Sequence, residues 1–76
     1  MQLTKEEFCL FNVASRVKLL NKDGVYMAKR WLDNHHEILL YKMSNYFVEL
    51  FVDKRTGHAL SVQPVINLQC LNWYND

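Results

Sequence analysis

Apolar residues that recur at intervals of three and four mark the first part of the chain as a helix. They are Leu10, Val13, Ala14, Val17 and Leu20. Polar residues fill most of the positions between them, which is the pattern of a helix with one core-facing stripe. Thr4 and Glu7 stand at capping-box spacing just before this stripe. The pattern therefore predicts one N-terminal helix over residues 5–20, ended by the segment that leads to Gly24.

Beyond Gly24 the apolar residues fall in short runs that are rich in Val, Leu, Tyr and Phe, which favours strands. The predicted strands are residues 25–32, 37–43, 46–53 and 58–62. The charged turn over residues 54–57 carries Gly57 where the backbone needs a positive φ. Because connections this short join only antiparallel neighbours, the four strands should form an antiparallel meander.

The last segment, after Pro64, gives a weaker signal. Its apolar residues are Val65, Ile66, Leu68, Leu71 and Trp73. They suit a short helix or an extended strap, and we favour the helix. With 76 residues the chain has one small core, so residues 1–76 form a single domain. We predict an α+β fold in which the N-terminal helix packs on one face of a four-stranded antiparallel meander sheet, followed by the short C-terminal helix or strap.

Turns of even length would fix the pairing of the strands. Under this assumption Trp31 lies opposite Ile38, Ile38 opposite Phe51, and Phe51 opposite Leu60. Both faces of the resulting sheet are largely apolar, so each face needs a cover. One face has no charge at its middle, and we assign the N-terminal helix to it. Its centre is formed by Leu39, Tyr41, Val48 and Leu50.

The other face mixes aromatic and charged side chains and is the candidate binding site. Its proposed binding residues are Lys29, Trp31, Lys42, Phe47 and Phe51. Residues 65–73 can close this face as a second small core. Alternatively, the face pairs two copies or docks a partner, because its composition resembles that of an interface. A third hypothesis is a platform for single-stranded nucleic acid, in which bases stack on the rings and lysines hold phosphates.

Four polar residues flank the predicted turns on neighbouring strands: Asp33, His36, Asp53 and His58. Adjacent strands lie about 4.8 Å apart, so neighbouring Asp and His side chains can share a divalent ion or form hydrogen-bonded pairs. None of the spacings matches a dedicated zinc motif. We therefore expect paired or solvated side chains and predict no metal and no cofactor.

Composition narrows the possible partners and the compartment. Nine basic and eight acidic residues give a net charge of +1. The sequence therefore shows no large basic surface of the kind that binds duplex DNA or an anionic membrane. The charged N-terminus lacks the apolar core of a signal peptide, and no apolar run has transmembrane length. Cys9 and Cys70 lie far apart in sequence and suit free thiols in a reducing compartment. We expect a cytoplasmic protein.

No catalytic signature is present. Ser15, Ser44 and Ser61 have no nucleophile motif around them, and two glycines are too few for a phosphate-binding loop. We therefore predict a small non-enzymatic interaction module that self-associates or docks a partner protein through the aromatic sheet face. Single-stranded nucleic-acid binding through the same face is the alternative.

Overall fold

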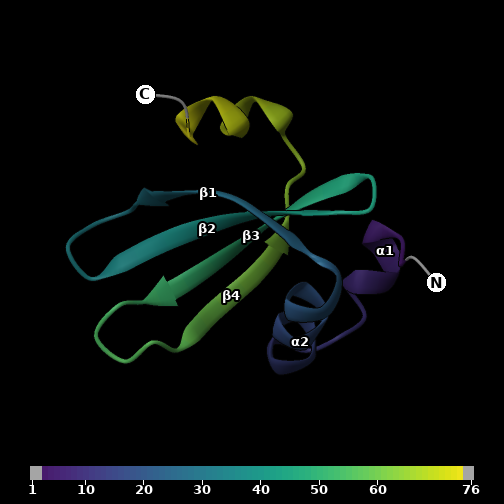
Figure 1. The fold of residues 1–76 in the computed structure, drawn as a ribbon, viewed down its shortest axis with the longest axis horizontal. Coiled ribbons are helices and arrows are strands. Elements are labelled where there is room, and N and C mark those ends of the chain that lie inside the picture. The colour runs from purple at the N-terminus through teal and green to yellow at the C-terminus, as the bar shows by residue number, and fades with distance from the viewer. Residues whose placement is uncertain (1–2, 75–76) are drawn as a thin grey trace.

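The computed structural model of the chain describes residues 3–74, apart from the side chain of Cys70. In this part the elements follow one another in a simple order (Figure 1). They are the helices α1 (Lys5–Phe8) and α2 (Val13–Asp23), the strands β1 (Val25–Trp31), β2 (His36–Met43), β3 (Tyr46–Asp53) and β4 (Ala59–Pro64), and the 3-10 helix η1 (Leu68–Tyr74). The sheet has the order β1-β2-β3-β4, and every neighbouring pair is antiparallel.

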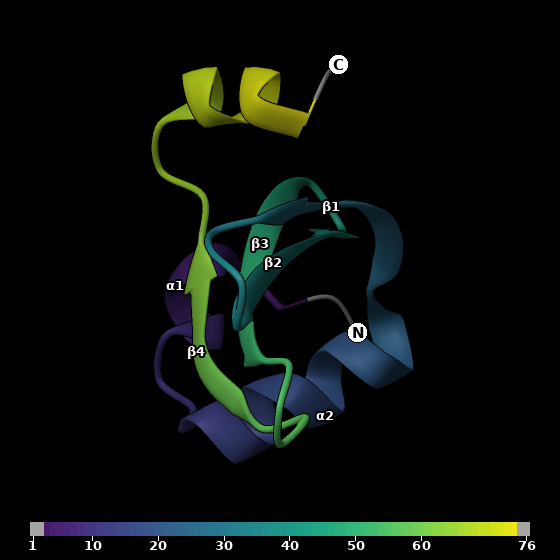
Figure 2. The same cartoon turned by 90° about the vertical axis from the view of Figure 1, so that its left-hand side faces the viewer.

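The sheet lies between two layers. Helices α1 and α2 cover one face, and η1 lies on the opposite side (Figure 2). Helix α2 packs against β4 and β2, and η1 packs against β1. The predicted α+β fold, with a helical layer on a four-stranded meander and a short C-terminal helix, is confirmed.

The main core lies between the helices and the sheet. Phe8 and Leu20 are fully buried there against Val48, which has no exposed surface. The other buried members are Met43, Tyr46, Leu50 and Val62. Leu39 and Tyr41 pack against this cluster. The helix therefore covers the face predicted for it, because burial of that apolar face is the main favourable term available to so small a chain.

The prediction of one continuous helix over residues 5–20 is wrong, because the structure has two helices there. Helix α1 ends at Phe8, and α2 begins only at Val13. Asn12 has an extended backbone, and its Oδ1 accepts the backbone N–H of Ser15 at 2.9 Å, so it caps the new helix. The capping box at the start of α1 forms as expected between Thr4 and Glu7.

The predicted register holds for the central pair of strands and fails by one residue at each edge. Ile38 lies opposite Phe51, as expected. Trp31 lies opposite Glu37 instead of Ile38, and Phe51 lies opposite Ser61 instead of Leu60. Each edge pair also contains a bulge, one between Tyr26 and Ala28 and one next to Val52.

The loop between β1 and β2 explains the first shift. The backbone N–H of Leu32 donates to the carbonyl of His36 at 3.0 Å, which leaves a loop of residues 33–35. A loop of odd length changes the register by one residue relative to an even one. Because side chains alternate along a strand, the end of β1 turns its other set of side chains to each face.

Candidate functional site

The five predicted binding residues are divided between the two faces of the sheet. Lys42, Phe47 and Phe51 lie on the η1 side, as expected. Lys29 and Trp31 lie opposite Leu39 and Glu37, so they point to the helical side. The prediction that all five share one face is therefore wrong, and the odd-length loop is the cause.

The C-terminal segment covers part of the η1 side. Leu40 and Val65 are buried there, and Phe47, Leu71 and Tyr74 pack against them. This small cluster is the second core that the sequence offered as one interpretation of the face. Phe47 therefore contributes to packing under η1, where its ring is partly shielded from solvent.

A polar cluster fastens η1 to the sheet. The hydroxyl of Tyr74 donates to Oε2 of Glu49 at 2.5 Å, and Nη2 of Arg30 donates to the same oxygen at 3.4 Å. The guanidinium of Arg30 also lies 4.7 Å from the ring centroid of Trp73. The side chains of Arg30 and Glu49 are mostly buried, so this ion pair is shielded from water more than a surface pair would be.

The environment of Tyr74 favours its neutral form. Burial raises the pKa of its phenol first, and the hydrogen bond to Glu49 raises it further. With Trp31 opposite Ile38, the sequence-based register puts Arg30 on the face under the helix, so this cluster was not predicted. The one-residue shift of β1 brings Arg30 under η1.

Trp31 lies at the end of β1 with cations close to its ring. Nζ of Lys54 is 3.6 Å from the ring centroid, and Nζ of Lys29 is 5.6 Å from it. The backbone N–H of Lys54 donates to the carbonyl of His35 at 2.8 Å, which positions the lysine beside the ring. Trp31 is nevertheless 56% exposed.

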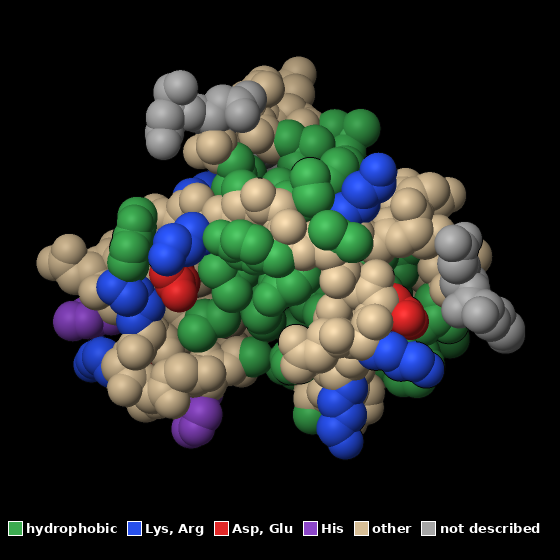
Figure 3. All heavy atoms as spheres, viewed as in Figure 1, with side chains coloured by type: hydrophobic (Ala, Val, Ile, Leu, Met, Phe, Trp, Pro, Cys, Tyr) green, Lys and Arg blue, Asp and Glu red, His purple; other side chains and the backbone are tan. Residues whose placement is uncertain are grey.

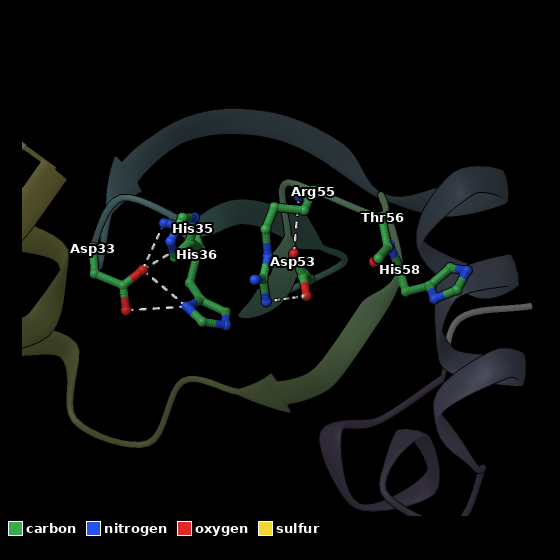
Figure 4. A network of polar contacts seen from close by, with 7 residues as sticks. All are labelled: Asp33, His35, His36, Asp53, Arg55, Thr56 and His58. Carbon is green, nitrogen blue, oxygen red and sulfur yellow. Dashed lines mark hydrogen bonds and ion pairs between the residues drawn. The ribbon is translucent and has the colours of Figure 1, made fainter.

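The polar residues at the turns form two separate pairs (Figure 4). Both carboxylate oxygens of Asp33 contact Nδ1 of His36, at 2.9 and 3.0 Å. Asp53 accepts the backbone N–H of Arg55 at 2.9 Å, and the ring of His58 points away from it. Among the described residues no group of three His, Cys, Asp or Glu side chains could hold a metal ion.

Backbone hydrogen bonds set the ionisation of the two aspartates. The N–H of His35 lowers the pKa of Asp33, and the side chain of His36 lowers it further. The N–H of Arg55 lowers the pKa of Asp53. The two carboxylates are therefore held as acceptors within their own turns.

Large apolar side chains remain exposed along β1 and on η1. We call this region the β1–η1 surface. It comprises Val25, Tyr26, Met27, Trp31, Leu68 and Trp73, each at least half exposed. It wraps around the β1 edge of the sheet, because Tyr26 and Trp31 lie on the helical face, opposite Tyr41 and Glu37. Figure 3 shows hydrophobic side chains gathered below η1 and over the adjoining part of the sheet. The sequence-based register placed Val25, Met27 and Trp31 on the candidate binding face and Tyr26 on the face under the helix, and it gave no position for Leu68 and Trp73.

Comparisons with known proteins give no relative. No family model, no curated protein and no solved structure matches the chain. Cys9 is a free, exposed thiol, whereas the side chain of Cys70 lies outside the described residues. In residues 3–74 no helix has the length and hydropathy needed to cross a membrane.

Proposed function

We propose that this chain is a small non-enzymatic interaction module that docks a protein, either a second copy or a different partner, through the β1–η1 surface. The observation that supports this proposal is the exposure of six large apolar side chains on two elements in contact. Soluble monomers rarely leave a continuous apolar patch of more than a few hundred Å² uncovered.

The composition of the surface also favours protein binding. It contains two tryptophans, a tyrosine and a methionine, with Arg30 beside one of the tryptophans. Tryptophan, tyrosine and arginine are the residues that most often carry the binding energy of an interface. Arg30 is already held by Glu49 and Tyr74, and Trp73 lies against its guanidinium, so binding costs less side-chain entropy at this point.

Single-stranded nucleic acid draws less support from the geometry than a protein partner does. Lys54 already occupies a face of the Trp31 ring at 3.6 Å, so a stacked base would have to displace it. Phe47 packs under η1, which withdraws one of the rings that were expected to receive bases.

Photo-crosslinking at single positions tests the proposal. A photoreactive residue is placed at Met27, on the proposed surface, or at Lys18, which is exposed on α2 outside that surface. We expect adducts with one defined protein from Met27 only, reproduced with the purified components and lost on Trp73→Lys. Equal yields from both positions, or no adduct from Met27, would contradict the proposal.

A further inference from the structure

We infer that β1 pairs antiparallel with β1 of a second copy, about a two-fold axis at Arg30, to give one continuous sheet of twice four strands. This inference rests on the proposed function and names its partner. Three observations support it. The edge strand β1 has backbone groups that point outward, its side chains are ordered so that two copies complement each other, and the opposite edge at β4 is blocked.

The backbone of β1 presents free donors and acceptors at its outer side. Leu32 and His36 form a hydrogen-bonded pair through the N–H of Leu32. In an antiparallel ladder such pairs alternate with pairs that share no bond, so the positions of Lys29 and Trp31 are not bonded to β2. Their N–H and C=O groups point away from the sheet, as on any open edge strand.

A two-fold axis at Arg30 makes these groups complementary. Lys29 of one copy then lies opposite Trp31 of the other, and each such pair exchanges both of its N–H···O bonds. An ammonium group also binds the face of an indole ring, so Lys29 of the second copy would take the face of Trp31 that Lys54 of the same chain leaves open. Within one chain Lys29 and Trp31 already approach to 5.6 Å. Moving the axis to Lys29 would bring two lysines face to face, and their ion pairs with Glu37 at 4.0 Å are longer and more exposed than that of Arg30 with Glu49 at 3.4 Å.

The charge at the axis is neutralised within each copy. Arg30 pairs with Glu49 at 3.4 Å and lies under the ring of Trp73. The two Arg30 residues therefore lie opposite each other at the axis, but each guanidinium points to Glu49 of its own sheet, which neutralises its charge. Because Trp73 contacts Arg30, it also lies beside the axis. Its exposed surface is available to the partner copy.

Bulges limit how far the pairing extends. The bulge between Tyr26 and Ala28 interrupts the regular edge of β1, so the shared ladder is confined to residues 29–31. The apolar side chains on either side of this short ladder complete the contact. A brief ladder flanked by side-chain packing makes a reversible dimer.

The opposite edge of the sheet is closed to pairing. Nη1 of Arg16 donates to the carbonyl of Val62 in β4. Pro64 ends this strand and has no N–H group. The register shift next to Val52 also bends this edge. Since the sheet of residues 25–64 has one open edge, the assembly closes at two copies and does not grow into a fibre.

Sedimentation equilibrium and amide hydrogen exchange on the full chain test the inference together. At about 1 mM protein we expect twice the 9.1 kDa mass of the chain, with the amide protons of Lys29 and Trp31 protected. Dilution should return the single mass and speed exchange at these two amides. A dimer in which both amides exchange rapidly would overturn the pairing of β1 edges, and so would a single mass at the higher concentration.

Two variants and a control separate the outcomes. Lys29→Pro removes one outward N–H and leaves the bonds to β2 intact, so we expect the single mass. Lys29→Glu removes the cation opposite Trp31 and should weaken the dimer at least about tenfold, and this variant decides the matter if the proline variant does not fold. Lys18→Glu on α2 should leave the dimer unchanged. A dimer that tolerates Lys29→Glu as well as Lys18→Glu would contradict the inference.

The proposed function can survive the failure of this inference. A chain that is monomeric at about 1 mM, yet forms adducts from Met27 with a different protein, would exclude the dimer and support docking. A chain that gives no adduct from Met27 and keeps a single mass would contradict both.

Discussion

Nη1 of Arg16 in α2 donates a hydrogen bond to the carbonyl oxygen of Val62 in β4, at 2.5 Å. The same guanidinium donates to the carbonyl of Cys9 at 2.9 Å and, through Nε, to that of Phe11 at 2.8 Å. Its central carbon lies 5.7 Å from the ring centroid of Phe8. One side chain therefore joins the segment between the two helices to the last strand of the sheet.

Loss of this side chain should destabilise the whole fold. We expect Arg16→Ala to lower the free energy of unfolding by about 2 to 4 kcal/mol, since three carbonyl groups lose a charged donor. Arg16→Lys should recover only part of this loss, because an ammonium group lacks the planar fork. Urea denaturation gives the values. Lys18→Ala, an exposed change on the same helix, should stay within about 0.5 kcal/mol of the parent; a comparable loss there would refute the role given to Arg16.

The capping box of α1 offers a second test. The backbone N–H of Glu7 donates to Oγ1 of Thr4 at 3.1 Å, and that of Thr4 donates to Oε1 of Glu7 at 2.9 Å. Thr4→Ala should cost about 1 kcal/mol of unfolding free energy. Thr4→Ser keeps the acceptor and should behave nearly as the parent in the same denaturation experiment. Equal effects of the two substitutions would mean that the cap does not stabilise the helix.

The attachment of η1 should weaken at alkaline pH. Burial, and then the bond to Glu49, raises the pKa of Tyr74 in the folded state above its ordinary value of about 10. The stabilisation is therefore complete below pH 10 or so and is lost as the pH rises toward the folded-state pKa. Urea denaturation between about pH 9 and 11 should show falling stability, with a smaller slope for Tyr74→Phe. An unchanged slope in this variant would contradict the assignment.

Asp33 should remain ionised at unusually low pH. The N–H of His35 and the ring of His36 hold its carboxylate, which lowers its pKa in the folded chain. Its contribution to stability is present above the ordinary pKa of about 3.9 and is lost as the pH falls through the lower folded value. Titration of the side-chain carboxyl by NMR measures this pKa directly. A value at or above that of an unfolded aspartate would show that these hydrogen bonds are not maintained in solution.

The strands were predictable because local signals agree along that part of the chain. The runs of β-branched and aromatic residues, the turn with Gly57 and the short connections all point to one antiparallel meander. Gly57 takes a φ of 75°, as the turn requires. Burial also follows the prediction in the centre of the sheet, where Val48 lies fully inside the core under the helices.

The break in the helix was not predictable from periodicity. Leu10 fits the apolar stripe as well as its neighbours do, yet it is 84% exposed while Phe8 is fully buried. The deciding contacts are those of Arg16 with Cys9, Phe11 and the distant Val62. A pattern of three and four residues carries no information on a bond between positions so far apart in sequence.

The candidate site was only partly predictable for a related reason. Its register depends on whether the first hairpin loop has an odd or an even number of residues. The choice is made by Asp33, whose side chain accepts the N–H groups of His35 and His36 at 2.8 and 2.9 Å. This choice moves Lys29 and Trp31 to one face and brings Arg30 to Glu49 on the other.

The bond from the N–H of Lys54 to the carbonyl of His35 couples the two hairpin loops at the same end of the sheet. Neither loop can change length without disturbing the other. Insertions that are normally tolerated at the tip of a surface hairpin should therefore be poorly tolerated at both of these tips, and a peptide tag placed in either one would displace Lys54 from Trp31.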